Sequence, residues 1–232
     1  MNNDIVYILK NGITDDELIY SVRSVCKNFE FNQIWFAGGI PEHVSADHSL
    51  YIPQKGKNKW NKVTNTIKEI CKNKDITEDF WLFNDDFFIM RPLTTSLPPL
   101  IDGTIENRIR ILNKKYPITM SEYAKQLWMT NKLLKDHNCD TLNYALHVPM
   151  LINKKKALDT IWRFPDSLMF RSLYGNHHQI GGTVTGDVKI TELDIEPSED
   201  VYLLSTSDES FKRGRVGKFI RDKFPEKCRY ET

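Results

Sequence analysis

The segment FWLFNDDFFIM, residues 80–90, is the most apolar run in the chain, and two adjacent carboxylates interrupt it near its middle. Asp85 and Asp86 repel each other, and burial of both charges is costly unless a cation or hydrogen-bond donors offset it. A strand that ends at the rim of a parallel sheet meets this requirement, because its carboxyl end opens into the crevice where such sheets bind ligands. We therefore predict that these two aspartates lie at the rim of a ligand-binding crevice.

The chain before this segment alternates between strand and helix patterns. Residues 4–9, 33–37 and 50–52 are short apolar runs, and each of them ends at glycine or proline. Thr14 and Glu17 form a capping-box sequence ahead of the first helix. The apolar residues at helical spacing are Leu18, Val22 and Val25, then Trp60, Val63, Ile67 and Ile70. Strand, helix, strand, helix and strand in this order predict an α/β fold with a mostly parallel central sheet flanked by helices.

The second half of the chain is less regular. The expected elements are polar helical sequence over 104–137 broken at Pro117, an apolar run over 142–153, a helix over 154–163, an ordered glycine-containing loop over 165–186, strands at 188–193 and 201–204, and a basic tail over 212–229. No repeat and no low-complexity linker divides the chain, so we predict a single domain over residues 1–232.

Composition excludes several classes of protein. Of 232 residues, 40% are apolar and 27% are charged, which is typical of a globular chain. The net charge of +1 provides no overall field that would attract nucleic acid or membranes. The four cysteines are far apart and form no CxxC pair, which disfavours a zinc or thioredoxin motif and indicates reduced thiols. We find no signal peptide and no apolar run of about 18 residues, and we therefore expect a cytoplasmic protein.

Two carboxylates at a crevice suit a divalent cation. Asp85 and Asp86 would hold Mg²⁺ or Mn²⁺, while diphosphate oxygens and water complete the coordination shell. The cation would neutralise charge on a departing nucleotide and so ease its departure. The alternative is that the two acids cap a turn and pair with a nearby lysine. Their position in the middle of an apolar run favours the metal site.

The acidic segment also resembles a known motif. Residues 83–88, FNDDFF, resemble the short acidic motif with which GT-A glycosyltransferases hold their metal. Three further segments are similar, in order and spacing, to segments of the Stealth family of sugar-phosphate transferases. They are DIVY at residues 4–7, ELIYSVRS at 17–24 and HVP at 147–149. The resemblance covers roughly residues 4–150, and the chain also resembles small glycosyltransferases of bacteriophages and polysaccharide loci.

This resemblance implies a GT-A-like, Rossmann-like fold that uses a nucleotide-sugar donor, such as a UDP-sugar, and Mn²⁺ or Mg²⁺. Residues 1–100 would form the nucleotide-sugar-binding half, and residues 101–232 the acceptor-side half with its basic C-terminal helix. The base of the donor would lie near the first strand, beside Asp4 and Tyr7. The diphosphate would lie near Asn84, with Asp85 and Asp86 as its metal ligands and Asp85 also in a catalytic role.

Other polar residues are candidates for catalysis or donor binding. His147 follows an apolar run, and its neutral imidazole could take a proton from an acceptor hydroxyl or complete the metal shell. The alternative is a hydrogen-bonded core histidine. Arg171, Asn176 and His177 lie in the glycine-containing region, where they could bind the sugar or its phosphate, because arginine grips phosphate with two hydrogen bonds. The alternative is a surface loop with a structural arginine.

The C-terminal region offers a third carboxylate and a basic cover. Asp208 could be a further metal ligand, and Lys212 and Arg213 could fold over the diphosphate as a lid. The alternative is a solvated amphipathic helix that turns Val216, Phe219 and Ile220 toward the core. Both descriptions can hold for different faces of one helix.

Four functions are compatible with these patterns. The first is transfer of a sugar from a nucleotide donor to a hydroxyl of a cell-surface polysaccharide or of a hydroxymethylated base in phage DNA, where the basic tail would meet the backbone. The second is transfer of sugar-1-phosphate to a capsular or wall polymer, as the Stealth resemblance implies. The third is a nucleotide-sugar-binding module without catalysis. A metal-dependent nuclease or phosphatase is the fourth, and it needs more acids than the sequence places near Asp85.

Overall fold

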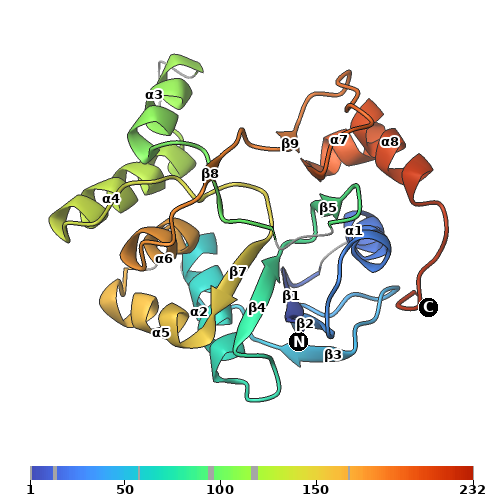
Figure 1. Ribbon diagram of the computed structural model, residues 1–232, viewed down its shortest axis with the longest axis horizontal. Coiled ribbons are helices and arrows are strands. Elements are labelled where there is room, and N and C mark those ends of the chain that lie inside the picture. The colour runs from blue at the N-terminus through green and yellow to red at the C-terminus, as the bar shows by residue number, and fades with distance from the viewer. Residues whose placement is uncertain are drawn as a thin grey trace.

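The computed structural model describes residues 2–12, 15–56, 58–93, 97–115, 120–166 and 168–231. Its centre is a five-stranded sheet in the order β3-β2-β1-β4-β7 (Figure 1). β1 (Asp4–Leu9), β2 (Ile34–Gly38), β3 (His48–Tyr51) and β4 (Asp79–Phe83) run parallel, and β7 (Met150–Asn153) pairs antiparallel with β4 at the edge. The predicted α/β class with a mostly parallel, helix-flanked sheet is confirmed.

Helices cover both faces of this sheet. They are α1 (Asp15–Asn28) on one face, and α2 (Lys59–Lys72) and α5 (Lys154–Arg163) on the other. Tyr7 and Leu9 pack with the apolar residues of α1, whereas Val6 packs with those of α2. Because both faces are buried, β1 and β4 consist almost entirely of apolar residues instead of alternating with polar ones.

The apolar run around Asp85 contributes one strand to each of two sheets. β4 belongs to the central sheet, and after a turn at residues 84–86 the chain enters β5 (Phe87–Ile89) of a small second sheet. In that sheet β10 (Leu203–Thr206) lies between β5 and β9 (Lys189–Ile190). Phe88 and Leu204 pack there against two C-terminal helices. These helices are α7 (Asp208–Arg213) and α8 (Arg215–Lys223).

A helical layer lies beyond β7. It contains α3 (Ile105–Lys115), α4 (Glu122–Asp136) and α6 (Phe170–His177), which pack around Leu127 and Leu173. The short strands β6 (Leu100–Ile101), which precedes α3, and β8 (Thr183–Val184), which follows α6, pair in parallel. Among the described residues, no helix combines the length and the apolar character needed to cross a membrane.

The sequence predictions for the second half need one correction. The expected loop over 165–186 is wrong, because it contains the buried helix α6. Ser172 and Asn176 are almost fully buried there, and a Cβ on Gly175 would lie only 2.4 Å from the Tyr144 ring. The apolar run over 142–153 is a strand only in its last four residues, which form β7. Glycine and polar residues in a buried helix gave no periodic signal.

The late strands and the tail agree better with expectation. β9 is shorter than the predicted strand, and β10 lies two residues later than predicted. Gly214 divides the basic tail into α7 and α8, and Val216 and Ile220 are fully buried as expected of the amphipathic face. The last residues then run back to α1, where Arg23 forms an ion pair with Glu231 at 2.7 Å. Thr14 and Pro117 lie outside the described residues.

Candidate functional site

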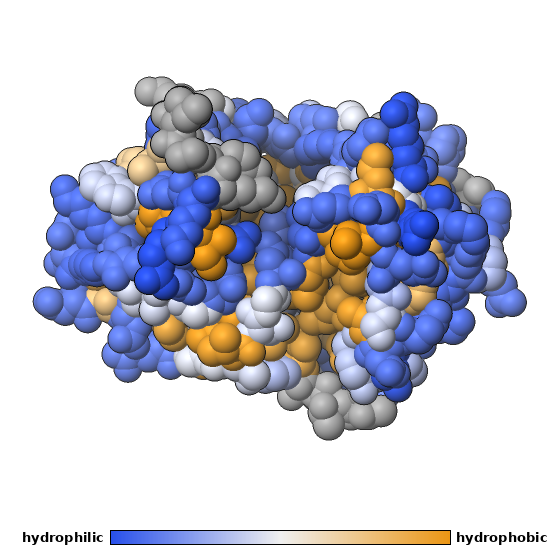
Figure 2. Space-filling model, turned by 90° about the horizontal axis from the view of Figure 1, so that it is seen from above, coloured by the Kyte–Doolittle hydropathy of each residue, from blue (hydrophilic) through white to orange (hydrophobic). Residues whose placement is uncertain are grey.

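The acidic turn lies at the carboxyl ends of two neighbouring parallel strands. Tyr7 of β1 pairs with Phe83 of β4, so both strands end at the same edge of the sheet, at Lys10 and at residues 84–86. Figure 2 looks down on this edge and shows a hollow with apolar residues between two more polar shoulders. The predicted placement of the aspartates at the carboxyl ends of parallel strands therefore agrees with the structure.

Within the described part of the chain, Asp86 has hydrogen-bond donors for only one of its two oxygens. Its Oδ2 accepts from Lys189 Nζ at 2.8 Å and from Ser205 Oγ at 3.1 Å. Its Oδ1 is buried and has no hydrogen-bond partner among the described residues. The alternative of a lysine pair is thus correct for one oxygen, while the other retains an unused and desolvated lone pair.

Asp85 is held in an environment that disfavours its charge. Burial, reinforced by the charge of Asp86, raises the pKa of Asp85 from 3.8 to about 6, and Asp208 adds to the rise. The ammonium of Lys10 opposes this shift without cancelling it. Asp85 is therefore a carboxylate with too little positive charge around it.

Glu17 is a further member of this group, which the sequence analysis assigned only to a helix cap. It lies in the first turn of α1, is 9% exposed, and accepts a hydrogen bond from the Thr206 hydroxyl. Burial first, and then the charges of three aspartates, raise its pKa from 4.5 to about 7. A sequence signal for it exists, because Glu17, Ser21 and Ser24 follow one another at helical spacing and form a buried polar stripe.

Asp208 faces the same group from the C-terminal half of the chain. It is the exposed first residue of α7, and its charge contributes to the raised pKa of both Asp85 and Glu17. The charges of the three aspartates predicted as metal ligands thus act on one another or on Glu17, although within the described residues no three of these four carboxylates offer ligand atoms within 4.8 Å of one another. We call Glu17, Asp85, Asp86 and Asp208 the acidic group.

The chemistry of the acidic group suits a divalent cation, although its carboxylates would have to move closer together to share one ion. An unpartnered buried oxygen on Asp86 and raised pKa values at Asp85 and Glu17 are the signs of a negative site that lacks a positive charge. Carboxylate oxygens are the ligands that Mg²⁺ and Mn²⁺ prefer. Residues from α1, the β4–β5 turn and α7 would hold such an ion, with Asp86 offering Oδ1.

A pocket of about 220 Å³ lies beside the acidic turn. Asn84, His147 and Arg171 line it, together with Ile8 and Leu82 from β1 and β4. Aromatic side chains also contribute, namely Trp60, Tyr123 and Phe170. A roomier pocket of about 620 Å³ lies along β3 and α2, but none of the predicted site residues lines it.

His147 is oriented by an acidic partner. Its Nδ1 lies 3.0 Å from Asp187 Oδ2, and its backbone N–H also donates to Asp187. Burial alone would raise the pKa of Asp187, but the hydrogen bond from His147 holds it below the usual value. Arg108 Nη2, 3.6 Å from Asp187 Oδ2, extends this network. Because Nδ1 is engaged, Nε2 is the nitrogen that can accept a proton.

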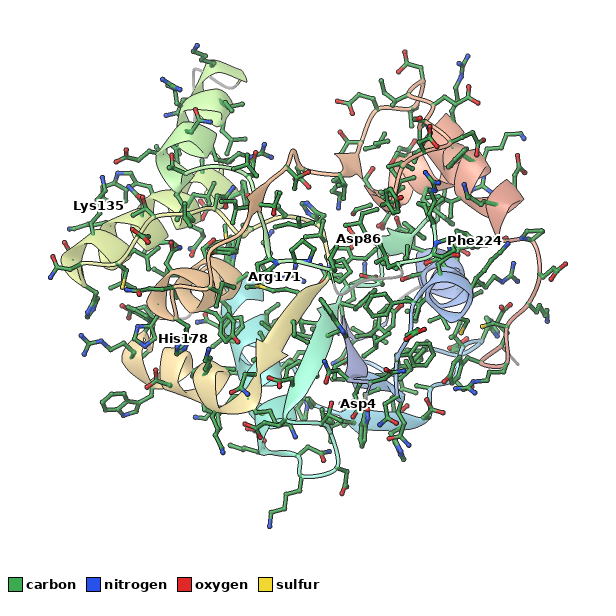
Figure 3. The ribbon with its side chains drawn as sticks, in the orientation of Figure 1. Asp4, Asp86, Lys135, Arg171, His178 and Phe224 are labelled. Atoms are coloured by element: carbon green, nitrogen blue, oxygen red, sulfur yellow. The ribbon has the colours of Figure 1, made fainter. Side chains whose placement is uncertain are left out.

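Arg171 forms the wall between the pocket and the acidic turn. Its Nη1 donates to the carbonyls of Leu146 and Val148, and its guanidinium lies 5.2 Å from the centre of the Phe87 ring. Burial lowers its pKa to about 10, although the charge of Asp86 opposes this, so the group stays protonated at neutral pH. Its Nη2 is buried and unpartnered within the described residues, which leaves one donor unused. Figure 3 shows Arg171 and Asp86 above Asp4 along the sheet.

Two residues predicted to bind the donor are buried in the core instead. Asp4 is fully buried at the amino end of β1, and it accepts from Asn32 Nδ2 at 2.8 Å and from the backbone N–H of Thr77 at 2.9 Å. Tyr7 is fully buried against Phe83, and its hydroxyl shares a hydrogen bond with Ser21. Both side chains therefore join elements of the core.

Two other predicted residues lie on the far part of α6. Asn176 holds the backbone of Leu142 through both ends of its amide, at 2.8 Å each. His177 lies against Asp159 of α5 at 2.8 Å. The structure does not place either residue in the acidic group or in the lining of the adjoining pocket.

The basic residues of α7 are divided between the rim and the solvent. Lys212 lies 3.4 Å from Asp16, next to Glu17 at the start of α1. Arg213 pairs with Glu209 on its own helix at 3.1 Å and is largely exposed. Of these two residues, Lys212 is thus the one that contacts α1, at the residue preceding Glu17.

No protein-family model and no curated protein matches the chain. Among solved structures, the glycosyltransferase GlyE of Streptococcus pneumoniae aligns with 59% of this chain at 10% identity and a TM-score of 0.32, and the chain spans 44% of GlyE. The galactosyltransferase LgtC in complex with donor and acceptor sugar analogues aligns with 98% at 10% identity and a TM-score of 0.40, over 85% of its own length.

Mouse xyloside xylosyltransferase 1 in its apo form aligns with all of this chain at 8% identity and a TM-score of 0.39, over 96% of its own length. The names of all three neighbours are those of sugar transferases. TM-scores below 0.5 mark a loose likeness, so the residues of this chain must carry any functional conclusion.

Proposed function

We propose that this chain is a metal-dependent glycosyltransferase with a GT-A-like fold, which moves a sugar from a nucleotide-sugar donor, such as a UDP-sugar, to a hydroxyl acceptor. One observation carries the proposal. The charges of Asp86 and Asp208 act on both Glu17 and Asp85, near the carboxyl ends of β1 and β4 and beside a pocket, and too little positive charge offsets them. A protein that needed no ligand there would lose stability through this repulsion without any gain.

The acidic group would hold the metal and, through it, the donor diphosphate. A bound Mg²⁺ or Mn²⁺ would supply charge neutralisation of the departing nucleotide. Asp86 Oδ1, Asp85 and Asp208 are the proposed ligands, and Glu17 completes the negative site. Asn84, Lys10 and Lys212 lie at the rim, where a diphosphate could meet their donors. These residues lie on three separate elements, α1, the β4–β5 turn and α7. Contacts from all three would fix the position of the donor.

The adjoining pocket would hold the reacting sugar and the acceptor hydroxyl. Aromatic walls suit the apolar faces of a sugar ring. With Nδ1 held by Asp187, His147 would accept the hydroxyl proton at Nε2, and Asp187 would stabilise the resulting imidazolium. Arg171 would keep a positive charge between the pocket and Asp86. Asp187 is then a positioning residue that acts through His147.

A saccharide is the favoured acceptor over hydroxymethylated DNA. Three of the four basic residues of α8 are paired with carboxylates, Lys218 with Asp222, Lys223 with Glu199 and Arg215 with Glu196, and Arg221 donates to the Phe211 carbonyl. Net charge is only +1, so a counterion-release contribution from DNA would be small. The finer alternative from the Stealth resemblance, transfer of sugar-1-phosphate to a polymer, uses the same site and differs in which bond of the donor breaks.

A second candidate, a nucleotide-sugar-binding module without turnover, is favoured by one contact. Lys189 places an ammonium 2.8 Å from Asp86, where it neutralises part of the charge that a metal ion would otherwise neutralise. In that case the donor would bind without manganese, and removal of Lys189 would weaken binding.

A thermal-shift screen of nucleotide sugars with and without Mn²⁺ tests the proposal. A ligand that binds only the folded state raises the midpoint of unfolding, so the correct donor should stand out only when the metal is present. Chromatography of the reaction with that donor then identifies the product. Release of a nucleoside diphosphate supports glycosyl transfer, and release of the monophosphate supports sugar-phosphate transfer. Binding without manganese and without product selects the binding module. No shift with any nucleotide sugar contradicts both.

A further inference from the structure

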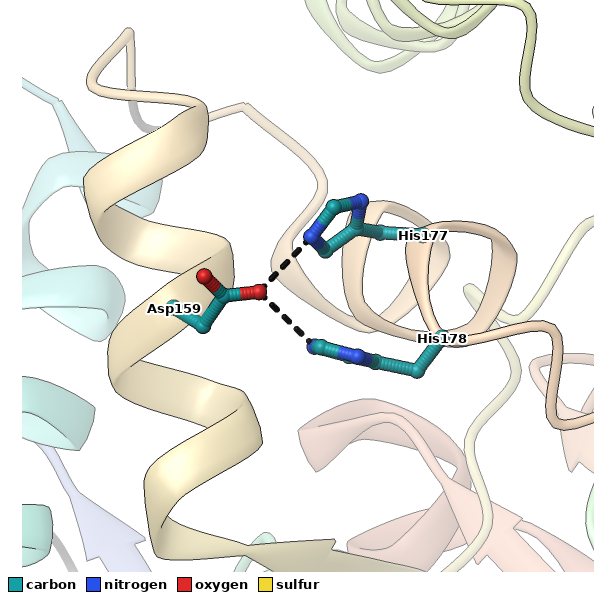
Figure 4. Close-up of side chains that lie close together, drawn as sticks. All are labelled: Asp159, His177 and His178. Carbon is teal, nitrogen blue, oxygen red and sulfur yellow. Dashed lines mark hydrogen bonds and ion pairs between the residues drawn. The ribbon is translucent and has the colours of Figure 1, made fainter.

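Two histidines and an aspartate converge on the side of the molecule away from the acidic group. His177 and His178 end α6, and Asp159 lies on α5 (Figure 4). Within the described residues, these three form the one group of His, Cys, Asp or Glu side chains whose ligand atoms all lie within 4.8 Å of one another. Along α6, about 10 Å of helix separates His178 from Arg171, and Figure 3 shows His178 well apart from Asp86.

Both imidazoles point at the same carboxylate oxygen. Asp159 Oδ2 lies 2.8 Å from His177 Nε2 and 3.8 Å from His178 Nε2. The second distance is too long for a hydrogen bond. Two ligands of one tetrahedral zinc ion lie about 3.3 Å apart, given metal–ligand distances of about 2.0–2.1 Å. The observed pair of distances brackets this value, so small side-chain rotations would place the three atoms around one ion.

We propose that Asp159, His177 and His178 form a binding site for zinc or a similar divalent transition metal, with water in the remaining position. Two imidazole nitrogens and one carboxylate oxygen are a ligand set that zinc prefers and that magnesium and calcium do not. Asp159 is 51% exposed, so the ion can enter from solvent and keep a water ligand.

His178 can change partners without leaving a buried group unpaired. Its Nε2 now lies 2.8 Å from the Lys156 carbonyl oxygen and 3.0 Å from Thr160 Oγ1. The Thr160 hydroxyl also donates to the Lys156 carbonyl at 2.9 Å, so that carbonyl stays satisfied when the imidazole turns to a metal. Burial lowers the pKa of His178, which favours the neutral form that binds metals.

The surroundings oppose the ion only weakly. The charges of His177 and Lys156 lower the pKa of His178, while Asp159 acts in the opposite direction. The Phe164 ring packs edge-on against the His177 ring, with centroids 5.4 Å apart, and helps to fix its orientation. A bound zinc would join α5 to α6, the helix whose other end carries Arg171, and so would stiffen the wall of the candidate pocket.

Equilibrium dialysis of the tag-free, metal-stripped, full-length protein against zinc chloride tests this site. We expect one zinc per chain at neutral pH, and a loss of affinity of at least about tenfold in His177→Ala and in Asp159→Asn. Binding should weaken below about pH 6, because protonated imidazoles do not coordinate. Cobalt(II) should give the visible absorption of a four-coordinate ion in the wild-type protein, a readout that does not depend on any variant folding.

Two controls separate this site from other metal binding. Asp166→Asn makes the same chemical change at an exposed aspartate close to the end of α5 and should leave zinc binding unchanged. Asp85→Asn with Asp86→Asn removes charge from the acidic group and should also leave it unchanged. The proposal is overturned by absence of zinc and cobalt binding, by binding that survives both His177→Ala and Asp159→Asn, or by loss of binding in the acidic-group variant alone.

Discussion

Buried carboxylates at the two ends of the central sheet differ in their hydrogen bonding. At the amino end, Asp4 is fully buried, and each of its oxygens accepts a hydrogen bond, from Asn32 or from Thr77. At the carboxyl end, Asp86 is almost as buried, yet Oδ1 has no partner among the described residues, and neighbouring Asp85 has its pKa raised to about 6. The same strands thus carry one satisfied and one unsatisfied acidic site.

This difference distinguishes a carboxylate that stabilises the fold from carboxylates that are expected to bind a ligand. A carboxylate that serves the fold is surrounded by donors, because an unpaired buried charge destabilises the folded state. The acidic group keeps its charges close together and short of donors, which is expected where a ligand supplies the missing positive charge. Variants at the two ends should therefore affect stability and activity in opposite ways.

The largest effect is expected from Asp86→Asn. This change keeps the shape of the side chain but removes the charge that would hold the metal and the diphosphate. We expect turnover of the donor to fall by about 10²–10³-fold, as for loss of one group that stabilises transition-state charge. Stability near pH 7 should change little, because the relief of repulsion on Asp85 and Glu17 offsets the loss of the ion pair with Lys189. Product formation and thermal unfolding measure the two quantities, and full activity in Asp86→Asn would remove the metal-dependent mechanism.

The matched change at the other end is Asp4→Asn. Asp4 now accepts hydrogen bonds from Asn32 and from Thr77. In the variant, one of these two N–H groups would face the side-chain NH₂ group of asparagine, so a buried donor would lose its acceptor. We expect a loss of about 3 kcal/mol in the free energy of unfolding, with turnover per folded molecule unchanged. Urea unfolding and active-site-normalised rates test this. If Asp4→Asn lowered turnover as strongly as Asp86→Asn, the contrast between the two ends would fail, and Asp4 would return as a donor-binding residue.

The sequence predicted one end of this comparison better than the other. Adjacent aspartates in an apolar run violate a local rule, and the structure places them after β4 at the carboxyl edge of the sheet, as predicted. Asp4 also stands at the start of an apolar run, but its partners Asn32 and Thr77 come from distant segments, and no pattern in the chain shows that they saturate it. A resemblance at residues 4–7 predicted donor contact for Asp4 and Tyr7, while the structure buries both in the core.

Glu17 and α6 show two further reasons for the misses. The capping-box pattern at Glu17 explained the residue locally, so its role across the fold beside Thr206 stayed hidden. In α6, four glycines in the wider region favoured a loop, although Gly175 is required only because Tyr144 packs against the helix. Periodicity predicts elements with one apolar face, and it says little where tertiary contacts select small or polar residues.

An intermediate effect is expected from pH, because Glu17 has a pKa of about 7 in the folded state and an ordinary value of 4.5. Between these values the folded state keeps a proton that the unfolded chain has lost, so stability of the metal-free protein should fall as pH rises from about 5 to 7. The expected loss is about 1–3 kcal/mol. Urea unfolding at pH 5 and pH 7.5 measures it.

Two variants of this measurement test the cause. Glu17→Gln should flatten the fall, since glutamine can still accept from Thr206 but does not titrate, while Asp85 retains its smaller part of the slope. Mn²⁺ at pH 7.5 should offset the loss in the wild type by binding only the folded state. An unchanged slope in Glu17→Gln would mean that the carboxyl end of the sheet is as well compensated as the amino end.

The smallest effect is expected at the rim, from Lys212→Ala. Lys212 lies 3.4 Å from Asp16, beside Glu17, whereas Lys218 forms an ion pair with Asp222 on α8 and serves as the matched control. An exposed ammonium near a diphosphate contributes less than about 1 kcal/mol, so the donor KM should rise only about threefold while kcat holds. The rise should shrink at high salt, because screening weakens exposed charges. If Lys218→Ala raised the donor KM by the same factor, the effect would come from the overall positive charge of the C-terminal tail and not from a contact of Lys212. The predicted role of α7 as a lid over the diphosphate would then be rejected.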